Sequence, residues 1–332
     1  MRRRGLSPAM VQTVLIYSMG EVIGDGLIKL PFIAGLRAAF PDARISWCAA
    51  KGETVYAGPL KAVVAGYVDE VILEGANGAK ALDSLPWVRP FGGRTFDLVI
   101  DTQENLRRAD VARRGAAGRF VSAARQARAK DWPVAVTDRL ARLLALATDG
   151  QGAPKPLALA HPDALKAAEI LLPAGPTYVG LAPGAGGQDK RWPLENYLDL
   201  ARRIAAKGWT PVFLFGPDEA EDAAIAAREV PQALQPERNR TDGLPVKGPL
   251  LVIALAGRLA AGVANDAGPG HMLAAGGAPL LSLQQDRRKA VKFRPAAQRL
   301  EMLVAEDYGN GMGALPVDAA WAALEKLMSG AS

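Results

Sequence analysis

Short apolar runs alternate with helical stretches along most of the chain, and this alternation restricts the fold more than any other feature. The runs TVLIY (13–17), ARISWCA (43–49), DEVILE (69–74) and DLVID (97–101) are typical of buried strands, and LIKLPFIAGLRAAF (27–40) is typical of a helix. Strands separated by helices form parallel sheets with helices on both faces. The first half of the chain is therefore predicted to be a doubly wound α/β domain.

The same pattern restarts after GQGAPKPLALAHP (150–162), a candidate linker. Strands are predicted at TYVGLA, TPVFLFG, the end of LLVIALAGRLAAGVAND, and APLLSLQ; helices are predicted over 194–208 and from DEAEDAAIAAREV and HMLAAGG. We predict an N-terminal Rossmann-like domain over 1–155, a second Rossmann-like domain over 156–316, and a C-terminal helix over 317–332 that could pack back on the N-terminal domain. Two domains suit 332 residues at about 150 residues each.

Composition excludes several classes of protein. Hydrophobic residues make up 49% of the chain, enough for packed cores. One cysteine and two histidines leave no intramolecular disulfide and make a structural zinc site improbable. No apolar run approaches the roughly 18 residues of a membrane span, and the basic start MRRRGLSPAM is followed only by the short run VLIY. We therefore expect a cytoplasmic protein without a signal peptide.

The chain is basic, with a net charge of +6 and a pI of about 9.5, which favours anionic partners. Much of this charge lies between residues 107 and 130, where it is either a solvated helix face or a binding surface. No RNA-binding aromatic motif or helix-turn-helix pattern accompanies it, so nucleic acid is not an expected partner. Four of these charges are carried by Arg107, Arg108, Arg113 and Arg114.

Glycine-rich loops follow three of the predicted strands: SMGEVIGDG, PGAGGQDKRWP (183–193) and NDAGPGH. Ligands of open α/β sheets bind beyond the carboxyl ends of the strands, so these loops are expected to line one interdomain cleft. Lys190 could meet a phosphate as a point charge. Asn265 and Asp266 are residue types that cap helices, and the helix that follows would offer its N-terminus to an anion. An ordinary surface turn and an ordinary capped helix are the alternatives.

Several motifs with known chemistry are missing. The chain has no Walker A loop, no G-x-G-x-x-G after the first strand, no G-x-S-x-G and no D-x-D. This counts against a dinucleotide dehydrogenase and a serine hydrolase, and it gives no sign of a metal-bridged diphosphate. We expect no metal and no obligate cofactor. Asp25 could act as a general base after the first strand, with Glu21 as a rival and a turn-forming aspartate as the alternative.

Four segments taken together resemble glycosyltransferase family 9, the ADP-heptose:lipopolysaccharide heptosyltransferases. They are GDGLIKLPFIAGLRAAFPDARI, FDLVIDTQENLRRADVARRGA, GLAPGAGGQDKRWPLENYLDLARRI and GVANDAGPGHMLAAGGAPLLSL, in the family's order. The resemblance implies a GT-B fold, with two Rossmann-like domains facing across a cleft. It implies an N-terminal acceptor domain, a C-terminal nucleotide-sugar domain, and inverting transfer without an obligate metal.

The resemblance also implies roles for individual residues. Asp25 matches the catalytic aspartate, and Lys190 matches the lysine on the donor phosphates. Glu219, which follows the strand 210–216, is our own hypothesis for binding the ribose. The predicted donor-binding residues are Gly184, Lys190, Arg191, Glu219, Asp266, Gly268, Gly270 and His271. The expected substrates are a nucleotide sugar, ADP-heptose by default, and a lipopolysaccharide core acceptor. The enzyme would then work at the cytoplasmic face of the inner membrane as a peripheral protein. The residues predicted to contact an anionic glycolipid acceptor or the membrane surface are Arg107, Arg108, Arg113 and Arg114, which lie in the half assigned to the acceptor.

The chain departs from the family pattern at three places. The first loop, M-G-E-V-I-G-D, is one residue longer than usual, Ala267 replaces a serine or threonine, and SLQQDRRKAVKFRP (282–295) replaces F-G-P-T-x-P. A sugar other than heptose, or a base other than adenine, therefore stays open. Two other functions also stay open: a nucleotide-sugar-binding relative that has lost transfer, and another nucleotide-dependent α/β enzyme such as an epimerase or a dehydrogenase.

Overall fold

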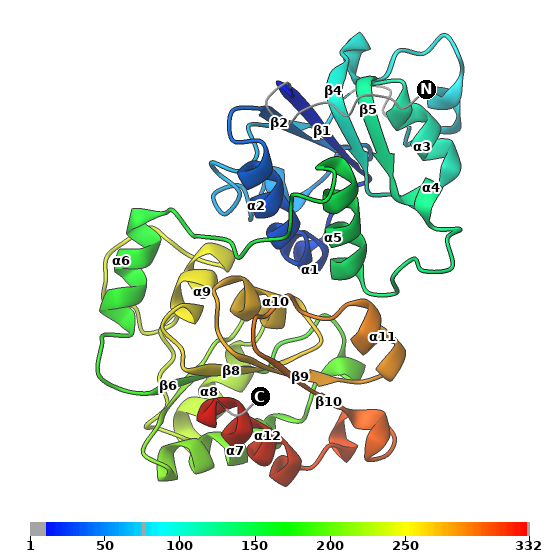
Figure 1. The fold of residues 1–332 in the computed structure, drawn as a ribbon. Helices are drawn as coiled ribbons and strands as arrows, with labels where there is room; N and C mark the ends of the chain where they lie inside the picture. The colour runs from blue at the N-terminus through cyan, green and yellow to red at the C-terminus, as the bar shows by residue number, and fades with distance from the viewer. Residues whose placement is uncertain (1–10, 75–77, 331–332) are drawn as a thin grey trace. The chain divides into compact units, whose positions relative to one another are not determined.

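The structure, a computed structural model, describes residues 11–74 and 78–330. The chain divides into two compact units, Met1–Leu157 and Ala158–Ser332. Each unit is built around a five-stranded sheet in which every strand pairing is parallel (Figure 1). The prediction of a GT-B-type α/β chain with two doubly wound units is confirmed.

The first sheet has the strand order β3-β2-β1-β4-β5. Its central strand carries TVLIYS, five residues of which are buried, as a parallel strand covered on both faces requires. The strands are β1 (Thr13–Ser18), β2 (Arg44–Ala49), β3 (Glu70–Ile72), β4 (Phe96–Asp101) and β5 (Ala116–Ser122). Four of the five were predicted, and the fifth, β5, lies inside the basic segment that one interpretation took for a helix face.

The helices of the first unit are α1 (Ile23–Ile28), α2 (Leu30–Ala39), α3 (Leu106–Arg113), α4 (Ala123–Gln126) and α5 (Val136–Ala147). Helices α2 and α5 pack together, and α5 also packs on β4 and β5. Ala112 of α3 packs with Leu15, Tyr17 and Val99 of the sheet in one apolar cluster. The single helix predicted over 27–40 is wrong in detail: two helices meet at Lys29, and Pro31 lies in the first turn of the second, where its missing N–H costs nothing.

The second sheet has the order β10-β9-β8-β6-β7. Its strands are β6 (Tyr178–Ala182), β7 (Thr210–Phe213), β8 (Ala261–Asn265), β9 (Leu280–Gln284) and β10 (Leu300–Val304). Every residue of β6, β8 and β9 is buried, which explains why the sequence shows them as continuous apolar runs. The edge strand β10 was not predicted.

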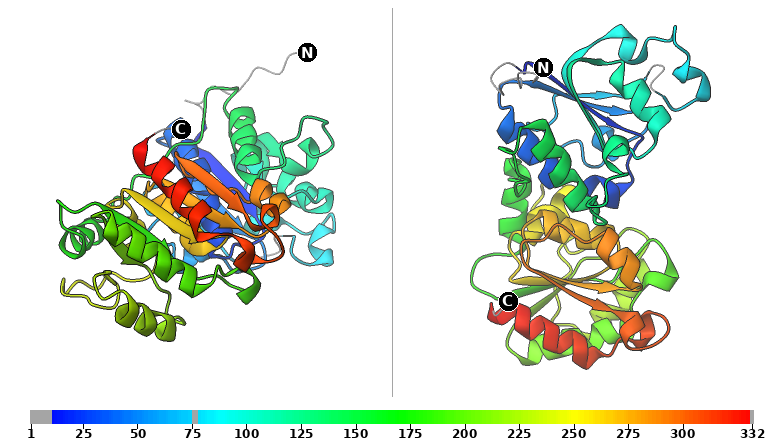
Figure 2. Two further views of the ribbon diagram at one scale, coloured as in Figure 1. Left: turned by 90° about the horizontal axis from the view of Figure 1, so that it is seen from below. Right: turned by 45° about the vertical axis from the view of Figure 1, so that its right-hand side comes forward.

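The helices of the second unit are α6 (Pro162–Leu171), α7 (Leu194–Ala206), α8 (Ala220–Glu229), α9 (Pro249–Ala256), α10 (Gly268–Ala275), α11 (Arg287–Lys292) and α12 (Val317–Ser329). In Figure 1, α9 and α10 cover one face of the sheet, and α7 and α12 cover the other. Figure 2 shows α12, in red, lying along this sheet. Its buried residues Ala320, Leu324 and Leu327 belong to the apolar core of the second unit.

Each sheet has one point where the strand order reverses. In the first unit β1 lies between β2 and β4, so the chain leaves β1 and β4 toward opposite edges of the sheet; β6 and β8 stand in the same relation in the second unit. Such a reversal leaves a crevice beyond the carboxyl ends of the two strands, where α/β proteins bind ligands. A ligand-binding site is therefore expected at each of these two reversal points.

Candidate functional site

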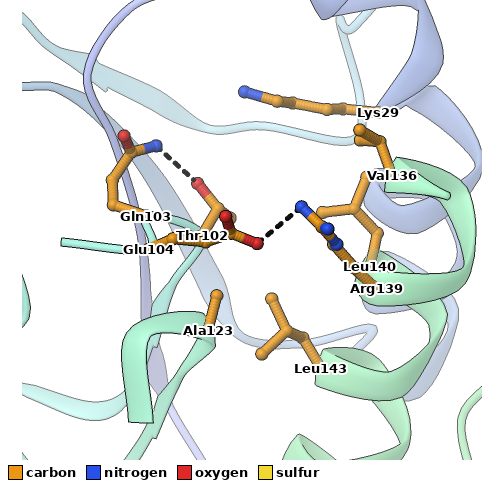
Figure 3. Close-up of a pocket in the computed structure, with 9 residues that line it drawn as sticks. All are labelled: Lys29, Thr102, Gln103, Glu104, Ala123, Val136, Arg139, Leu140 and Leu143. Atoms are coloured by element: carbon orange, nitrogen blue, oxygen red, sulfur yellow. Dashed lines mark hydrogen bonds and ion pairs between the residues drawn. The ribbon is translucent and has the colours of Figure 1, made fainter. Parts of the chain in front are cut away.

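A pocket lies at the reversal point of the first unit. Thr102, directly after β4, donates its backbone N–H to the Tyr17 carbonyl at 3.1 Å, which holds the segments after β1 and β4 side by side. The cavity measures about 310 Å³. Figure 3 shows the residues that line it, which are Lys29, Thr102, Gln103, Glu104, Ala123, Val136, Arg139, Leu140 and Leu143.

The pocket joins an apolar wall to a polar rim. Ala123, Leu140 and Leu143 are buried apolar residues, whereas Lys29 and Arg139 are cations that each pair with a carboxylate, Lys29 with Glu21 and Arg139 with Glu104. Arg139 forms an ion pair with Glu104 at 2.5 Å, drawn as a dashed line in Figure 3. An apolar surface with a few fixed polar groups is the usual make-up of a small-molecule site. The arrangement suits a small molecule that has both an apolar face and polar groups.

Glu21 and Asp25, the two rivals for the general base, occupy different environments. Glu21 is buried, and its carboxylate accepts hydrogen bonds from Ser18, Lys29, Trp47 and Thr54. All of its acceptor capacity is therefore used to hold the loop after β1.

Asp25 is exposed in the first turn of α1, and within residues 11–74 and 78–330 its carboxylate takes part in no hydrogen bond or ion pair. Of the two, only Asp25 has a carboxylate that is open to a substrate. The longer first loop thus leaves the predicted base accessible, and its catalytic role stays a prediction.

Asp101, the last residue of β4, is a buried carboxylate next to the pocket. It accepts hydrogen bonds from the Ser122 hydroxyl at 2.7 Å and from the Gln103 backbone N–H at 2.9 Å. Burial raises the pKa of this carboxyl from 3.8 to about 6, although both hydrogen bonds act in the opposite direction. The hydrogen bond from the Gln103 N–H to Asp101 fixes the backbone of this pocket residue just beyond β4.

In the second unit, Asn265 connects the two strand ends at the reversal point. This buried residue closes β8; its side chain donates to the Pro183 carbonyl at 2.6 Å and accepts from the Trp192 N–H and the Tyr197 hydroxyl, both at 3.2 Å. The predicted donor loop 183–193 is thus attached at both of its ends to the last residue of β8.

Lys190 and Asp266, both predicted to bind the donor, lie together at this point. The Lys190 ammonium is 3.5 Å from the Asp266 carboxylate, and Lys190 is partly exposed. The pair leaves a cation at the carboxyl ends of β6 and β8, where it could meet a phosphate.

Gly184, Arg191 and Glu219 form a second cluster of predicted donor residues. Glu219 is buried, accepts the Gly216 N–H at 2.7 Å, and faces the Arg191 guanidinium at 3.7 Å. A Cβ atom at position 184 would lie 2.2 Å from a Glu219 oxygen, so only glycine leaves room for this carboxylate. One oxygen of Glu219 is held by the backbone, and the other is directed toward Gly184 and Arg191.

Helix α10 begins differently from the prediction. Its N-cap is Ala267, and no side chain caps it, because Asn265 is used in the bonds described above and Asp266 pairs with Lys190. Pro269 has no N–H, and the Gly270 N–H donates to Ala267. Of the backbone N–H groups in residues 268–270, that of Gly268 makes no hydrogen bond within the part of the chain that the structure describes. His271 is buried in the same turn.

The basic segment 107–130 is not a single helix face, since it spans α3, β5 and α4, and the acceptor role of its arginines stays a prediction. Arg107 donates to the Lys80 carbonyl and to the Ser84 hydroxyl, and Arg114 donates to three backbone carbonyls. Arg113 is exposed over the Phe120 ring, and Arg108 is half-buried. Arg107 and Arg114 thus shape the surface near α3 as well as charging it.

Two further properties concern the parts of the chain that the structure describes. They contain no cluster of three or more His, Cys, Asp or Glu residues placed to hold a metal ion. Among the described helices, none combines the length and the apolar composition that a membrane crossing requires.

Comparison with known proteins places this geometry in a family. A sequence profile described as glycosyltransferase family 9 (heptosyltransferase) matches residues 87–311. No curated protein matches the chain. Several solved structures are similar over almost its whole length.

A family 9 glycosyltransferase from Veillonella parvula superposes with a TM-score of 0.71 at 18% identity, covering 99% of each chain. The E. coli heptosyltransferase WaaC, solved with ADP-2-deoxy-2-fluoro heptose, gives 0.66 at 20% identity and covers 95% of this chain and 99% of its own. The E. coli ADP-heptose lipopolysaccharide heptosyltransferase II gives 0.63 at 17% identity and covers 96% of this chain and 99% of its own. At these identities the likeness shows a shared fold.

The buried carboxyl of Asp101 predicts a pH-dependent stability. Its pKa is raised in the folded protein, so its protonated form is favoured there, and stability is lost as the pH rises from about 4 through about 6. In Asp101→Asn this loss is absent. Between pH 4 and pH 7.5 the free energy of unfolding of the wild type should fall by about 2 kcal/mol relative to that of the variant. Urea unfolding across this range measures the difference. The exposed Asp110→Asn serves as control, and parallel profiles of wild type and Asp101→Asn would contradict the assignment.

Proposed function

Since the chain belongs to glycosyltransferase family 9, as the match over residues 87–311 shows, we propose that it is an inverting glycosyltransferase for lipopolysaccharide core or a related surface glycan. The donor in this proposal is a nucleotide diphosphate sugar, ADP-heptose by default. The observation that carries the proposal is the pairing of Lys190 with Asp266 where β6 and β8 end. A cation at this place, beside the open N–H of Gly268, suits the diphosphate of such a donor.

In the proposed reaction, Asp25 accepts the proton of an acceptor hydroxyl. The hydroxyl oxygen forms a bond to the anomeric carbon from the side opposite the diphosphate, and the bond from that carbon to the leaving oxygen breaks. The electron pair goes to the nucleoside diphosphate, so negative charge grows on it in the transition state. Groups already aimed at developing charge are usually the largest contribution to catalysis. Lys190 and the Gly268 N–H are proposed for this role, without an obligate metal.

The acceptor is proposed to bind in the pocket of the first unit. The wall formed by Ala123, Leu140 and Leu143 offers an apolar surface to a sugar ring, and the ion-paired side chains of Lys29 and Arg139 offer N–H donors to the hydroxyls of that ring. A lipid-linked acceptor would bring the enzyme to the cytoplasmic face of the inner membrane as a peripheral protein. The excess of basic residues favours that association.

The first prediction concerns the donor diphosphate. Lys190→Ala removes the cation and leaves Asp266 facing the phosphates, so ADP should bind about tenfold to a hundredfold more weakly. Titration calorimetry with ADP, UDP, GDP and NAD on both proteins measures this. Lys166→Ala, at an exposed position of α6, is the matched control and should leave affinity unchanged.

The choice among nucleotides decides the donor. Selective binding of ADP that weakens in Lys190→Ala supports an ADP-heptose-type donor. Selective binding of UDP or GDP keeps the reaction class and discards heptose as the default sugar. Binding of NAD alone, or of no nucleotide, contradicts the proposal.

The second prediction concerns the ribose. If Glu219 accepts a hydrogen bond from a ribose hydroxyl, wild type should bind ADP about tenfold more tightly than its 2′,3′-dideoxy analogue. In Glu219→Ala this ratio should fall to about one, whereas a merely structural role would weaken both ligands equally. The exposed Glu221→Ala is the control. An unchanged ratio would remove Glu219 from the donor site.

The third prediction concerns the base. Asp25→Asn should lower the turnover number by about 10²–10⁴ and leave ADP affinity unchanged, because the carboxylate acts only on the acceptor proton. Transfer to a water-soluble saccharide acceptor, followed by release of the nucleoside diphosphate, measures this. Asp42→Asn, an exposed change in the same unit, should behave as wild type. Near-normal turnover in Asp25→Asn would refute the assignment.

A further inference from the structure

One surface of the first unit exposes large apolar side chains beside basic ones. Trp87 is 75% exposed, Leu82 is 69% exposed, and Leu106, at the start of α3, is 44% exposed. Single exposed leucines are ordinary on protein surfaces. An exposed tryptophan in the same short segment as an exposed leucine is less usual and marks a place where another apolar medium could be met.

Arginines hold the segment that carries Leu82 and Trp87 against α3. The segment 80–89, which contains the short helical turn Ala81–Ser84, runs along α3 (Figure 1, in cyan). At one end of α3, Arg107 donates to the Lys80 carbonyl and to the Ser84 hydroxyl, both at 3.0 Å. At the other end, Arg114 donates to the carbonyls of Asp83, Leu85 and Val88 at 2.6–2.9 Å. Trp87 is thus anchored on both sides along the chain.

The charge around these apolar residues is mostly positive. Lys80, Arg89, Arg107 and Arg113 are all exposed on the segment or on α3. Asp83 is half-buried, and one of its oxygens accepts the N–H groups of Gly78 and Lys80, so its carboxylate offsets one of these positive charges. Asp110, on α3, is paired with Arg125 at 3.3 Å.

We propose that the segment 80–89, with the start of α3, is a docking surface for an anionic bilayer. Trp87 and Leu82 would enter the boundary between headgroups and acyl chains, where the amphipathic indole is favoured, and the basic residues would meet lipid phosphates. The inference rests on the proposed function in one respect, that a lipid-linked acceptor brings the enzyme to a membrane. A second copy of the chain fits this surface less well, since two positively charged faces repel.

The test measures binding to two kinds of vesicle. One contains phosphatidylcholine alone, and the other also contains phosphatidylglycerol as about a third of its lipid, which makes its surface anionic. The double variant Leu82→Ser/Trp87→Ser should bind the anionic vesicles at least about tenfold more weakly than wild type. The matched control is Leu165→Ser/Val291→Ser, which changes two exposed apolar residues of the second unit and should bind as wild type. Both substituted residues in the test variant are exposed, and thermal unfolding checks that it folds.

Charge and insertion are tested separately. Arg89→Glu should weaken binding by about tenfold at moderate salt, whereas Lys166→Glu, the same charge change on α6, should not.

With lipids brominated on the acyl chains, wild-type tryptophan emission should be quenched on binding. Trp87→Phe should still bind and should lose that quenching.

Several outcomes overturn the inference: unchanged vesicle binding in the double variant, equal loss in Lys166→Glu, or quenching that persists in Trp87→Phe. A wild-type dimer that becomes a monomer in the double variant, with vesicle binding intact, would assign the surface to self-association instead. ADP binding and transfer to a water-soluble acceptor should be unchanged in the double variant. If the wild type fails in those two assays, the proposed function fails, whatever the vesicles show.

Discussion

The hydrogen bonds of the Asn265 side chain hold together the candidate donor site of the second unit. Asn265 ends β8, and its amide bonds to Pro183, Trp192 and Tyr197, so the loop 183–193 can follow only one path past the end of that strand. An amide buried without those partners would cost about 1–3 kcal/mol, which ties the loop to the folded sheet. The loop in turn positions Lys190 at Asp266 and brings Gly184 against Glu219.

In the first unit, too, a buried side chain holds the loop after a strand, but here it is a carboxylate and not an amide. Glu21 is buried among four donors and holds the loop after β1, while Asp25, four residues later, keeps an exposed carboxylate. In each unit a buried polar side chain does the structural work, and a charged residue near it in sequence stays accessible. A substrate group can then meet a charge whose backbone is already fixed, which is the preorganisation that transition-state stabilisation requires.

The central strands could be predicted from the sequence because parallel strands covered on both faces are continuous apolar runs, as in β1, β6 and β8. The edge strand β5 carries AAGRFVS, with exposed residues in its first half and a register shift against β4, so no apolar run marks it. The cap of α10 was mispredicted because tertiary bonds take the side chain that local sequence would assign to the helix. The pocket was missed because its residues come from the segment after β4 and from α4 and α5, which only the tertiary fold brings together.

The arginines near α3 show why a charge count alone could not assign that segment. Arg107 and Arg114 direct their N–H groups at neutral hydroxyl and carbonyl oxygens, so each guanidinium is held in place while its positive charge stays uncompensated. The same two residues therefore build the segment that exposes Trp87 and add to the field around it. Reversing the charge of Arg114 would remove the hydrogen bonds that hold the segment and would also lower the positive charge around it. Arg89 is exposed and directly follows Val88, whose carbonyl accepts from Arg114. Changing Arg89 therefore alters the surface charge without removing the hydrogen bonds that hold the segment.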